Sequence, residues 1–305
     1  TKCIFMKNNL TKNISVVGLG KLGACLAAFY ADSGFNVIGM DIDKNKVDAI
    51  NEAKAPIFEP ELDSMIKKNK TRLLATTDVE DAIMKSGITF MIMPTPSKKD
   101  GSFSVDFVLD AAKKIGPALK SKNKYHLFVL VSTVLPEDSR SKIIPAFEEY
   151  SGKKCGKDFG YCYSPSLIAL GNIIKNLQKP DFLFLGAFDK KANDILDKFY
   201  KKVYKSEDKI KKMSIESAEL AKISLNSYVT MKITFANVLG EVCNKIANAD
   251  VDEVTNAIGE DRRIGSYFFK SGLGYGGPCF PRDNFAFANM AQKRGISTPL
   301  ALVTH

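Results

Sequence analysis

The chain has 305 residues, 45% of them hydrophobic and 26% charged, a composition typical of a folded protein long enough for two domains and not of a disordered one. Its net charge of +10 comes mainly from scattered lysine pairs without interleaved aromatic residues, which argues against a nucleic-acid partner and mildly favours anionic ligands. Without a long apolar run, a signal peptide, or zinc or disulfide spacing among the six cysteines, we expect a cytoplasmic protein with no membrane span and no metal.

The first two thirds of the chain alternate apolar strand-like runs with helical patterns. ISVVG is followed by a helix through LAAFYADSG and by the strand FNVIGMD, which is a βαβ opening, and a later helix is predicted over residues 105–120. The predicted strands are residues 14–18, 35–41, 88–94, 126–132, 159–164 and 181–187. Such alternation predicts an α/β fold with a doubly wound, Rossmann-like parallel sheet covered on both faces.

The pattern changes near residue 212. Residues 214–248 contain no proline and keep helical apolar spacing, so they predict one long helix at the start of an all-helical domain. The lysine-rich stretch before this helix is the expected junction, with a cofactor domain over residues 1–210 and a helical domain over residues 211–305. Because the chain starts with Thr1 and stops inside a predicted helix, we expect a piece of a longer protein.

A glycine-rich stretch, GLGKLG at residues 18–23, follows the first predicted strand and opens a helix. Gly18 permits the tight turn, Gly20 lets the backbone approach a pyrophosphate, and Gly23 allows close packing of helix on strand. The helix N-terminus adds amide donors and a positive dipole end. Asp41 ends the second strand about 20 residues downstream, where a carboxylate accepts hydrogen bonds from the adenine ribose and repels a 2′-phosphate. The stretch therefore predicts an NAD site, the alternative being a glycine turn in a domain that binds nothing.

A second glycine-rich loop, GYGGPCFPRD, places Cys279 two residues before Pro281, and proline is favoured in the first turn of a helix. Unpaired amide donors and the helix dipole at this position favour the thiolate and hence nucleophilicity. Asp283 falls in the same turn. The plainer interpretation is a small apolar residue at a helix start with an acidic dipole partner.

Lys222 and Asn226 lie four residues apart in the long helix and therefore share one face. They are either part of a reaction centre or a solvated stripe. With only two histidines in the chain, we expect chemistry without a histidine base.

Several motifs together resemble the UDP-glucose/GDP-mannose dehydrogenase family. They are PIFEPELD at 56–63, MPTP at 93–96, STV at 132–134, AELAK at 218–222 followed by NSY, and the loop at 274–283. The resemblance implies oxidation of the C6 alcohol of a nucleoside-diphosphate sugar to a carboxylate, a four-electron reaction that uses two NAD in succession. UDP-glucose is the default substrate, with GDP-mannose or a UDP-amino sugar as alternatives.

The resemblance also assigns roles. Cys279 adds to the intermediate aldehyde, and the thiohemiacetal loses a second hydride to give a thioester that is hydrolysed. Lys222 stabilises oxyanion charge, Asn226 is an oxyanion or substrate donor, Asp283 orders the lysine and water network, and Thr133 positions a water beside the nicotinamide.

Binding residues follow from the same resemblance. The expected NAD residues are Gly18, Gly20, Leu22, Gly23, Asp41, Lys46, Thr95 and Thr133. The expected sugar-nucleotide residues are Lys222, Asn226, Phe268, Phe269, Gly272 and Gly276. In the family the long helix pairs with its counterpart, so we expect a homodimer through it. From the same resemblance we expect the family's third, nucleotide-binding domain to be absent from this chain.

One departure concerns the base for thioester hydrolysis. Where the family has a motif with two glutamates, this chain has SPSLIALG, so Ser166 and Leu170 replace them. Serine is no base without an activating group, and hydrolysis is expected to be slow, rerouted through Asp283 or a bound water, or blocked. Two alternatives therefore stay open: a protein that binds NAD or sugar nucleotides without catalysis, and a β-hydroxyacid-type dehydrogenase, which needs no nucleophilic cysteine.

Overall fold

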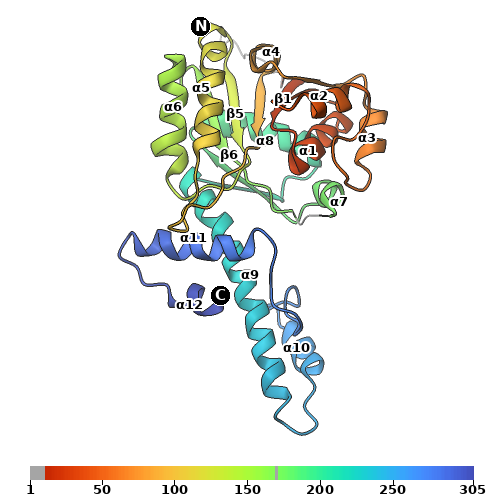
Figure 1. The fold of residues 1–305 in the computed structure, drawn as a ribbon, viewed down its shortest axis with the longest axis vertical. Helices are drawn as coiled ribbons and strands as arrows, with labels where there is room; N and C mark the ends of the chain where they lie inside the picture. The colour runs from red at the N-terminus through yellow and green to blue at the C-terminus, as the bar shows by residue number, and fades with distance from the viewer. Residues whose placement is uncertain (1–10, 169–170) are drawn as a thin grey trace, which may run out of the picture. The chain divides into compact units, whose positions relative to one another are not determined.

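The computed structural model describes residues 11–168 and 171–305, which form two compact units (Figure 1). Unit 1 contains Val105–Glu219 together with Thr95 and the described residues before it. Unit 2 contains Pro96–Ser104 and Leu220–His305. The division falls inside the long helix, beyond the junction that the sequence placed between residues 210 and 211.

Within the described residues, unit 1 is built on one eight-stranded sheet with the strand order β3-β2-β1-β4-β5-β6-β7-β8. The strands are β1 Asn13–Val17, β2 Asn36–Met40, β3 Leu73–Thr76, β4 Ile88–Met91, β5 His126–Leu130, β6 Phe159–Tyr163, β7 Leu183–Ala187 and β8 Ile210–Met213. The α/β class and all six predicted strands are confirmed. The order reverses between β1 and β4, and in such sheets the crevice at this switch point, at the carboxyl ends of the strands, is where ligands bind.

Two details of the sheet differ from the prediction. The sequence analysis missed β3 and β8, because both are short edge strands of four residues with partly exposed side chains and therefore lack a continuous apolar run. The prediction of a parallel sheet is wrong for one pair, since β6 and β7 are antiparallel. A parallel neighbour requires a crossover back to the starting end of the sheet, whereas β7 starts at the end where β6 finishes.

Helices cover both faces of this sheet. They are α1 Lys21–Asp32, α2 Lys44–Asn51, α3 Leu62–Lys68, α4 Val79–Lys85, α5 Asp106–Ser121, α6 Ile144–Ser151, α7 Ile173–Gln178 and α8 Lys190–Tyr204, with a π-helical turn, η1, at Ser139–Ile143. Figure 1 shows α5 and α6 on one side of the sheet and α1 and α3 on the other. The core on the α1 side is aromatic, with the Tyr30 ring 4.8 Å from Phe90 and 5.0 Å from Phe199 between centroids. Burial on both faces explains the largely apolar runs of β4, β5 and β6.

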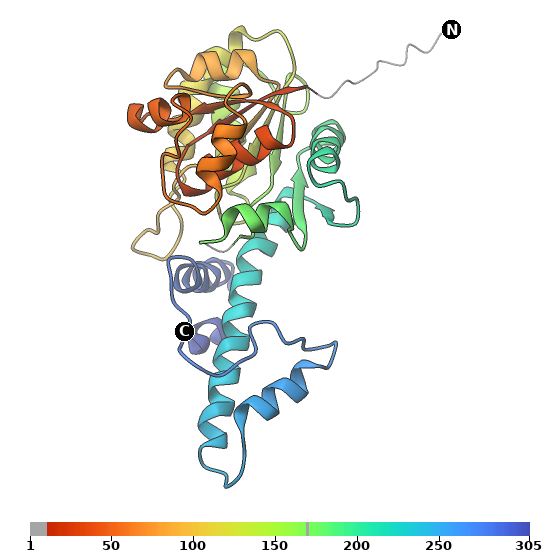
Figure 2. The same ribbon diagram turned by 90° about the vertical axis from the view of Figure 1, so that its right-hand side faces the viewer.

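Unit 2 is helical. Its elements are the part of α9 (Ile215–Cys243) beyond Glu219, then α10 Val251–Gly259, α11 Phe280–Gln292 and α12 Pro299–Thr304. Figure 2 shows α10 beside the C-terminal half of α9. The predicted long helix exists but ends at Cys243 rather than near residue 248. The chain there passes into tighter turns, with the Ile246 amide donating to the Cys243 carbonyl at 3.0 Å, and Asn248 has a φ of +64°. Asp250 then caps the next helix by accepting from the amides of Asp252 (2.7 Å) and Glu253 (3.2 Å).

A hairpin from the loop after β4 belongs to unit 2 as well. Ser97 pairs with Phe103 across it, and the Asp100 carboxylate lies 2.7 Å from the ammonium of Lys293, the residue after α11. The guanidinium of Arg282 lies 4.1 Å above the ring of Phe103. These contacts fix the hairpin on α11, so one compact unit includes a segment embedded in the sequence of the other.

None of the helices that the structure describes combines the length and the apolar character needed to cross a bilayer.

Candidate active site

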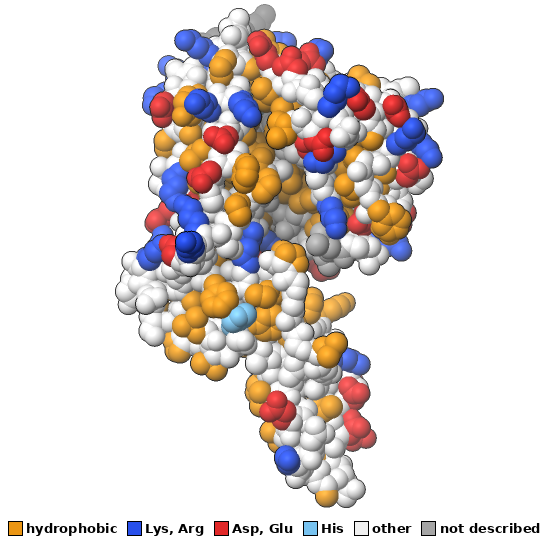
Figure 3. Space-filling view, in the orientation of Figure 1, with side chains coloured by type: hydrophobic (Ala, Val, Ile, Leu, Met, Phe, Trp, Pro, Cys, Tyr) orange, Lys and Arg blue, Asp and Glu red, His pale blue; other side chains and the backbone are white. Residues whose placement is uncertain are grey.

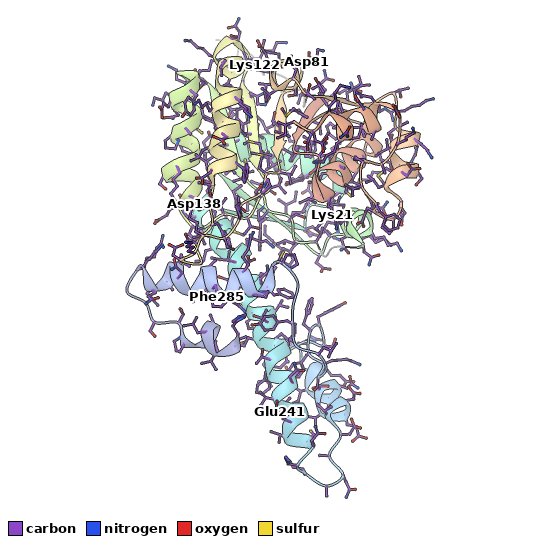
Figure 4. All side chains as sticks on the ribbon, viewed as in Figure 1. Lys21, Asp81, Lys122, Asp138, Glu241 and Phe285 are labelled. Atoms are coloured by element: carbon purple, nitrogen blue, oxygen red, sulfur yellow. The ribbon has the colours of Figure 1, made fainter. Side chains whose placement is uncertain are left out.

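The glycine-rich turn after β1 has the geometry of a phosphate-binding loop. Gly18 has a φ of +96°, and a Cβ at this position would overlap the carbonyl oxygen of Ile92, while a Cβ at Gly23 would overlap that of Gly18. Gly20, by contrast, has nothing within 4 Å of its Cβ position. Packing thus requires the outer glycines, and the middle one leaves open space at the start of α1, whose first residue, Lys21, is labelled in Figure 4.

The N-terminus of α1 is left open for an anion. Gly20 is the N-cap residue and supplies no side-chain acceptor, and among the described residues no other side chain caps the helix or places an acid in its first turn. The first amides of a helix have no partner within it. They can therefore donate to a phosphate, helped by the helix dipole.

Asp41 lies at the carboxyl end of β2, next to this turn. It is 8% exposed, and its Oδ2 accepts from the Leu19 amide at 2.7 Å while its Oδ1 accepts from the Asp43 amide at 2.9 Å. The ammonium of Lys46 lies 3.4 Å from Oδ2. The structure therefore brings Asp41 and Lys46 together beside the glycine turn, while the side chain of Leu22 packs on the hydrophobic core.

The loops after β4 and β5, which carry the MPTP and STV motifs, are bonded to each other. The hydroxyl of Ser132 donates to the Met93 carbonyl at 2.6 Å and accepts from the Met93 amide at 2.8 Å. The hydroxyl of Thr95 donates to the Thr133 carbonyl at 2.7 Å. Since β4 and β5 are parallel neighbours, Thr95 and Thr133 lie together at the carboxyl edge of the sheet.

In unit 2, the face of α9 that carries Lys222 and Asn226 meets the first turn of α11. The amide of Asn226 donates to the Asp283 carboxylate at 2.6 Å, and the Asp283 side chain is 1% exposed. The Nε of Arg282 lies 3.3 Å from the other carboxylate oxygen. Because Lys222 and Asn226 are each 9% exposed, the interpretation of a solvated stripe is wrong.

Lys222 lies within electrostatic range of both groups at the start of α11. Burial holds the pKa of its ammonium below the usual range, and the carboxylate of Asp283 and the thiol of Cys279 oppose this shift. Among the described residues, the Lys222 ammonium makes no direct hydrogen bond or ion pair. Its donors therefore remain available to a ligand, and a cation held beside a thiol can stabilise an oxyanion that forms there.

Cys279 is the N-cap residue of α11, and its side chain is exposed. Its carbonyl accepts from the Asp283 amide at 2.9 Å, which ties the two residues into one turn, and Pro281 lies in that turn as the sequence predicted. An exposed thiol at a helix N-terminus, near a buried lysine, suits nucleophilic attack.

Further polar residues, not predicted from the sequence, lie where α9 meets α11. Thr230 and Asn284 continue the contact of α9 with α11, with the Asn284 amide 3.0 Å from the Thr230 hydroxyl and 3.1 Å from that of Tyr275. The signal was present, because Thr230 lies four residues after Asn226 on the same helical face.

Glu219 was also missed, although it lies in the AELAK motif. Its side chain is fully buried in unit 1, where it accepts from the amides of Glu137 at 2.8 Å and Ser139 at 3.1 Å. Burial raises the pKa of its carboxyl to about 7. It therefore holds the backbone that follows the STV motif.

Of the expected sugar-nucleotide residues, Lys222 and Asn226 lie on α9, and the other four occupy one loop before α11. Phe268 is 55% exposed with a φ of +59°, whereas Phe269 is 4% exposed and anchors the loop. The amide of Gly272 donates to the Asn237 side chain at 2.9 Å, and Gly276 is exposed. Ser166 is half-buried in the loop after β6, and Leu170 lies outside the described residues.

Two parts of the chain match two different domains of one known protein family. Residues 12–204 match the NAD binding domain of the UDP-glucose/GDP-mannose dehydrogenase family, and residues 216–304 match its central domain. The chain is 33% identical to the GDP-mannose 6-dehydrogenase of Pseudomonas aeruginosa over 291 residues, which is 94% of this chain and 66% of that protein. It is 36% identical to the UDP-glucose 6-dehydrogenase AglM of Haloferax volcanii over 290 residues, which is 94% of this chain and 67% of that protein.

A solved structure of a dehydrogenase has a similar fold. A UDP-glucose dehydrogenase from the hyperthermophilic archaeon Pyrobaculum islandicum matches with a TM-score of 0.88 at 30% identity, over 98% of this chain and 68% of that one. The chain thus spans about two thirds of the length of the curated relatives it matches, at 66% for the first of them.

Proposed function

Because this chain belongs to the UDP-glucose/GDP-mannose dehydrogenase family, we propose that it oxidises the C6 alcohol of a nucleoside-diphosphate sugar to a carboxylate with NAD as the hydride acceptor. In the balanced reaction, one alcohol, one water and two NAD⁺ give one carboxylate, two NADH and three protons. The observation that carries the proposal is the cluster in unit 2, where Lys222 and Asn226 of α9 meet Asp283 and Cys279 at the start of α11.

Cys279 is the proposed nucleophile. Its sulfur adds to the aldehyde carbon that the first oxidation leaves, and this C–S bond retains the reactive aldehyde while the cofactor is exchanged. After a second hydride leaves the same carbon, water adds to the thioester, the C–S bond breaks and the thiolate departs. This chemistry needs a free thiol, and thiols stay reduced in the cytoplasm, where we place the reaction.

The remaining members of the cluster stabilise charge and hold geometry. The Lys222 ammonium neutralises the oxyanion formed at the sugar C6, and its burial increases the effect because the local dielectric constant is low. Asp283 fixes the orientation of the Asn226 amide through the 2.6 Å hydrogen bond, so the second N–H of that amide remains available to substrate oxygens.

NAD supplies the hydride-accepting nicotinamide. We propose that the backbone amides of Gly20 and Leu22 would donate hydrogen bonds to its pyrophosphate, and that the carboxylate of Asp41 would accept hydrogen bonds from its ribose hydroxyls. Thr95 and Thr133, which lie together at the carboxyl edge of the sheet, would contact the nicotinamide end of the cofactor. Lys46 accompanies Asp41 and balances its charge.

For the substrate we propose UDP-glucose first and GDP-mannose second. Relatives named for each sugar nucleotide match at comparable identity, 36% and 33%. Phe268, Phe269, Gly272 and Gly276 of the loop before α11 are the proposed contacts. The net charge of +10 is consistent with an anionic ligand.

The test counts NADH per active site when the protein is incubated with NAD and a panel of UDP- and GDP-sugars, while intact mass reports any adduct. Since Ser166 replaces the expected base, we expect a burst of up to two NADH per site followed by slow turnover, with an acyl adduct on Cys279. Restoring the base in Ser166→Glu should release the adduct and speed steady-state turnover by about 10²-fold or more, the range of general base catalysis. Ser166→Gln is the isosteric control and should stay slow.

Ligand binding without any NADH from any sugar would contradict catalysis and favour a binding protein. Steady turnover by the unaltered protein would instead show that another group replaces the base. An unchanged rate in Ser166→Glu would show that hydrolysis does not depend on this position.

We also propose a homodimer through α9. Four apolar side chains of this helix are 47–53% exposed, and their intervals of seven, three and four residues follow a coiled-coil seam. They are Tyr228, Phe235, Val238 and Val242. Hydrophobic side chains are visible over this helix in Figure 3. Light scattering should give twice the chain mass for the protein and the single chain mass for Val238→Asp/Val242→Asp, and a monomeric unaltered protein would refute the dimer.

A further inference from the structure

The loop between α10 and α11 is tied to α9 by a lysine that no step above uses. The ammonium of Lys232 donates to the carbonyl oxygens of Ile264 at 3.0 Å and Gly265 at 2.9 Å. Gly265 has a φ of +73°, so the chain turns sharply there. An ammonium with two carbonyl acceptors forms charge-assisted bonds, which are stronger than neutral ones.

Two further contacts of α9 hold the rest of the loop. The ring of Phe269 stacks on that of Phe235 with 6.2 Å between centroids and 12° between planes, and the Lys232 ammonium lies 5.8 Å from the Phe269 centroid. The Asn237 side chain accepts from the Gly272 amide at 2.9 Å. One helix therefore contacts the loop at three places between Ile264 and Gly272.

Two side chains between these anchors are exposed to solvent, Tyr267 at 84% and Phe268 at 55%. Leu273, the residue after the last anchor, is 96% exposed. Phe268 has a φ of +59°, which is rare for a bulky residue and persists only where the surroundings impose it. The contacts of Lys232 and Asn237 provide that constraint.

We propose that Lys232, assisted by Asn237, is a positioning residue that preforms the Phe268–Gly272 backbone for the nucleoside-diphosphate sugar. This inference rests on the function proposed above, because it assigns that loop to the substrate. Lys232 touches neither substrate nor cofactor. It acts by removing the cost of ordering the loop at the moment of binding.

The experiment has two readouts on Lys232→Met, which keeps the apolar length and removes the donors. Hydrogen exchange should show the amides of residues 266–272 exchanging about tenfold faster, the size of a small local opening. With NAD and UDP-glucose or GDP-mannose, KM for the sugar nucleotide should rise about tenfold while kcat and KM for NAD change less than about twofold, since only loop ordering is lost.

Conservative variants separate positioning from general structure. Lys232→Arg keeps a cationic donor and should restore both readouts to near the unaltered values. Asn237→Asp keeps the acceptor for Gly272, whereas Asn237→Leu removes it and should speed exchange of that amide. Lys245→Met, the same substitution at an exposed site after α9, is the control and should change nothing.

The outcomes distinguish this inference from the function on which it rests. Unchanged exchange in Lys232→Met overturns the inference alone, and so does faster exchange with an unchanged KM for both sugar nucleotides. An unaltered protein that binds neither UDP-glucose nor GDP-mannose overturns the proposed function and the inference together.

Discussion

Cys279→Ala should lower the rate of carboxylate formation at least a thousandfold, roughly the cost of removing a nucleophile from a covalent mechanism. No thiohemiacetal can form without the sulfur, so the second oxidation has no bound intermediate to act on. The measurement is NADH formation with NAD and the most active sugar nucleotide, together with intact mass to show that the adduct has disappeared.

The fold should survive this substitution. The Cys279 side chain is exposed, and its contact with α11 is made by the backbone carbonyl, which alanine retains. Cys155→Ala provides a control at a half-buried cysteine that has no proposed role, and it should remain active. Full turnover by Cys279→Ala would exclude the covalent mechanism and favour the β-hydroxyacid-type alternative.

Lys222→Met should lower kcat about 10²- to 10³-fold, the usual cost of removing one oxyanion-stabilising group. Methionine fills the same buried space without the charge, so the effect on kcat reports the ammonium and not a cavity. Because the group acts on charge that develops during reaction, the loss should appear mainly in kcat and less in KM. Stopped-flow measurement of NADH over a range of substrate concentrations separates the two constants.

Two comparisons make this result specific. Lys245→Met removes a lysine at an exposed position and should leave kcat unchanged. Lys222→Arg keeps a cation but changes its shape and donor geometry, so partial activity is expected. A Lys222→Met variant with an unchanged kcat would show that the buried ammonium is not the oxyanion partner.

The elements that were predicted correctly are those whose burial is complete. β4, β5 and β6 are covered on both faces, so most of their residues are apolar, and the buried Thr89 and His126 are hydrogen-bonded to each other. The runs were therefore visible from the sequence alone. The edge strands β3 and β8 pair on one side only and carry exposed side chains, including the two lysines of IKKM. Nothing in their residues alone distinguishes them from loop.

For the candidate site, local spacing was informative and long-range pairing was not. The four-residue interval of Lys222 and Asn226 placed both on one helical face, and Thr230 extends it. Whether that face is exposed or buried depends on α11, which lies more than fifty residues later in the chain. The hydrogen bond between Asn226 and Asp283 shows that α11 covers it.

The sequence by itself determined the glycine-rich turn after β1, because its three glycines recur at a characteristic spacing within six residues: Gly18 has a positive φ, and Gly23 packs on Gly18. It also determined that Cys279 begins a helix, since proline and the glycines before it act locally. Only the tertiary structure decided that Lys222 is buried beside that cysteine and that Lys232 holds the Phe268 loop, because desolvation and carbonyl contacts depend on segments brought together from distant parts of the chain.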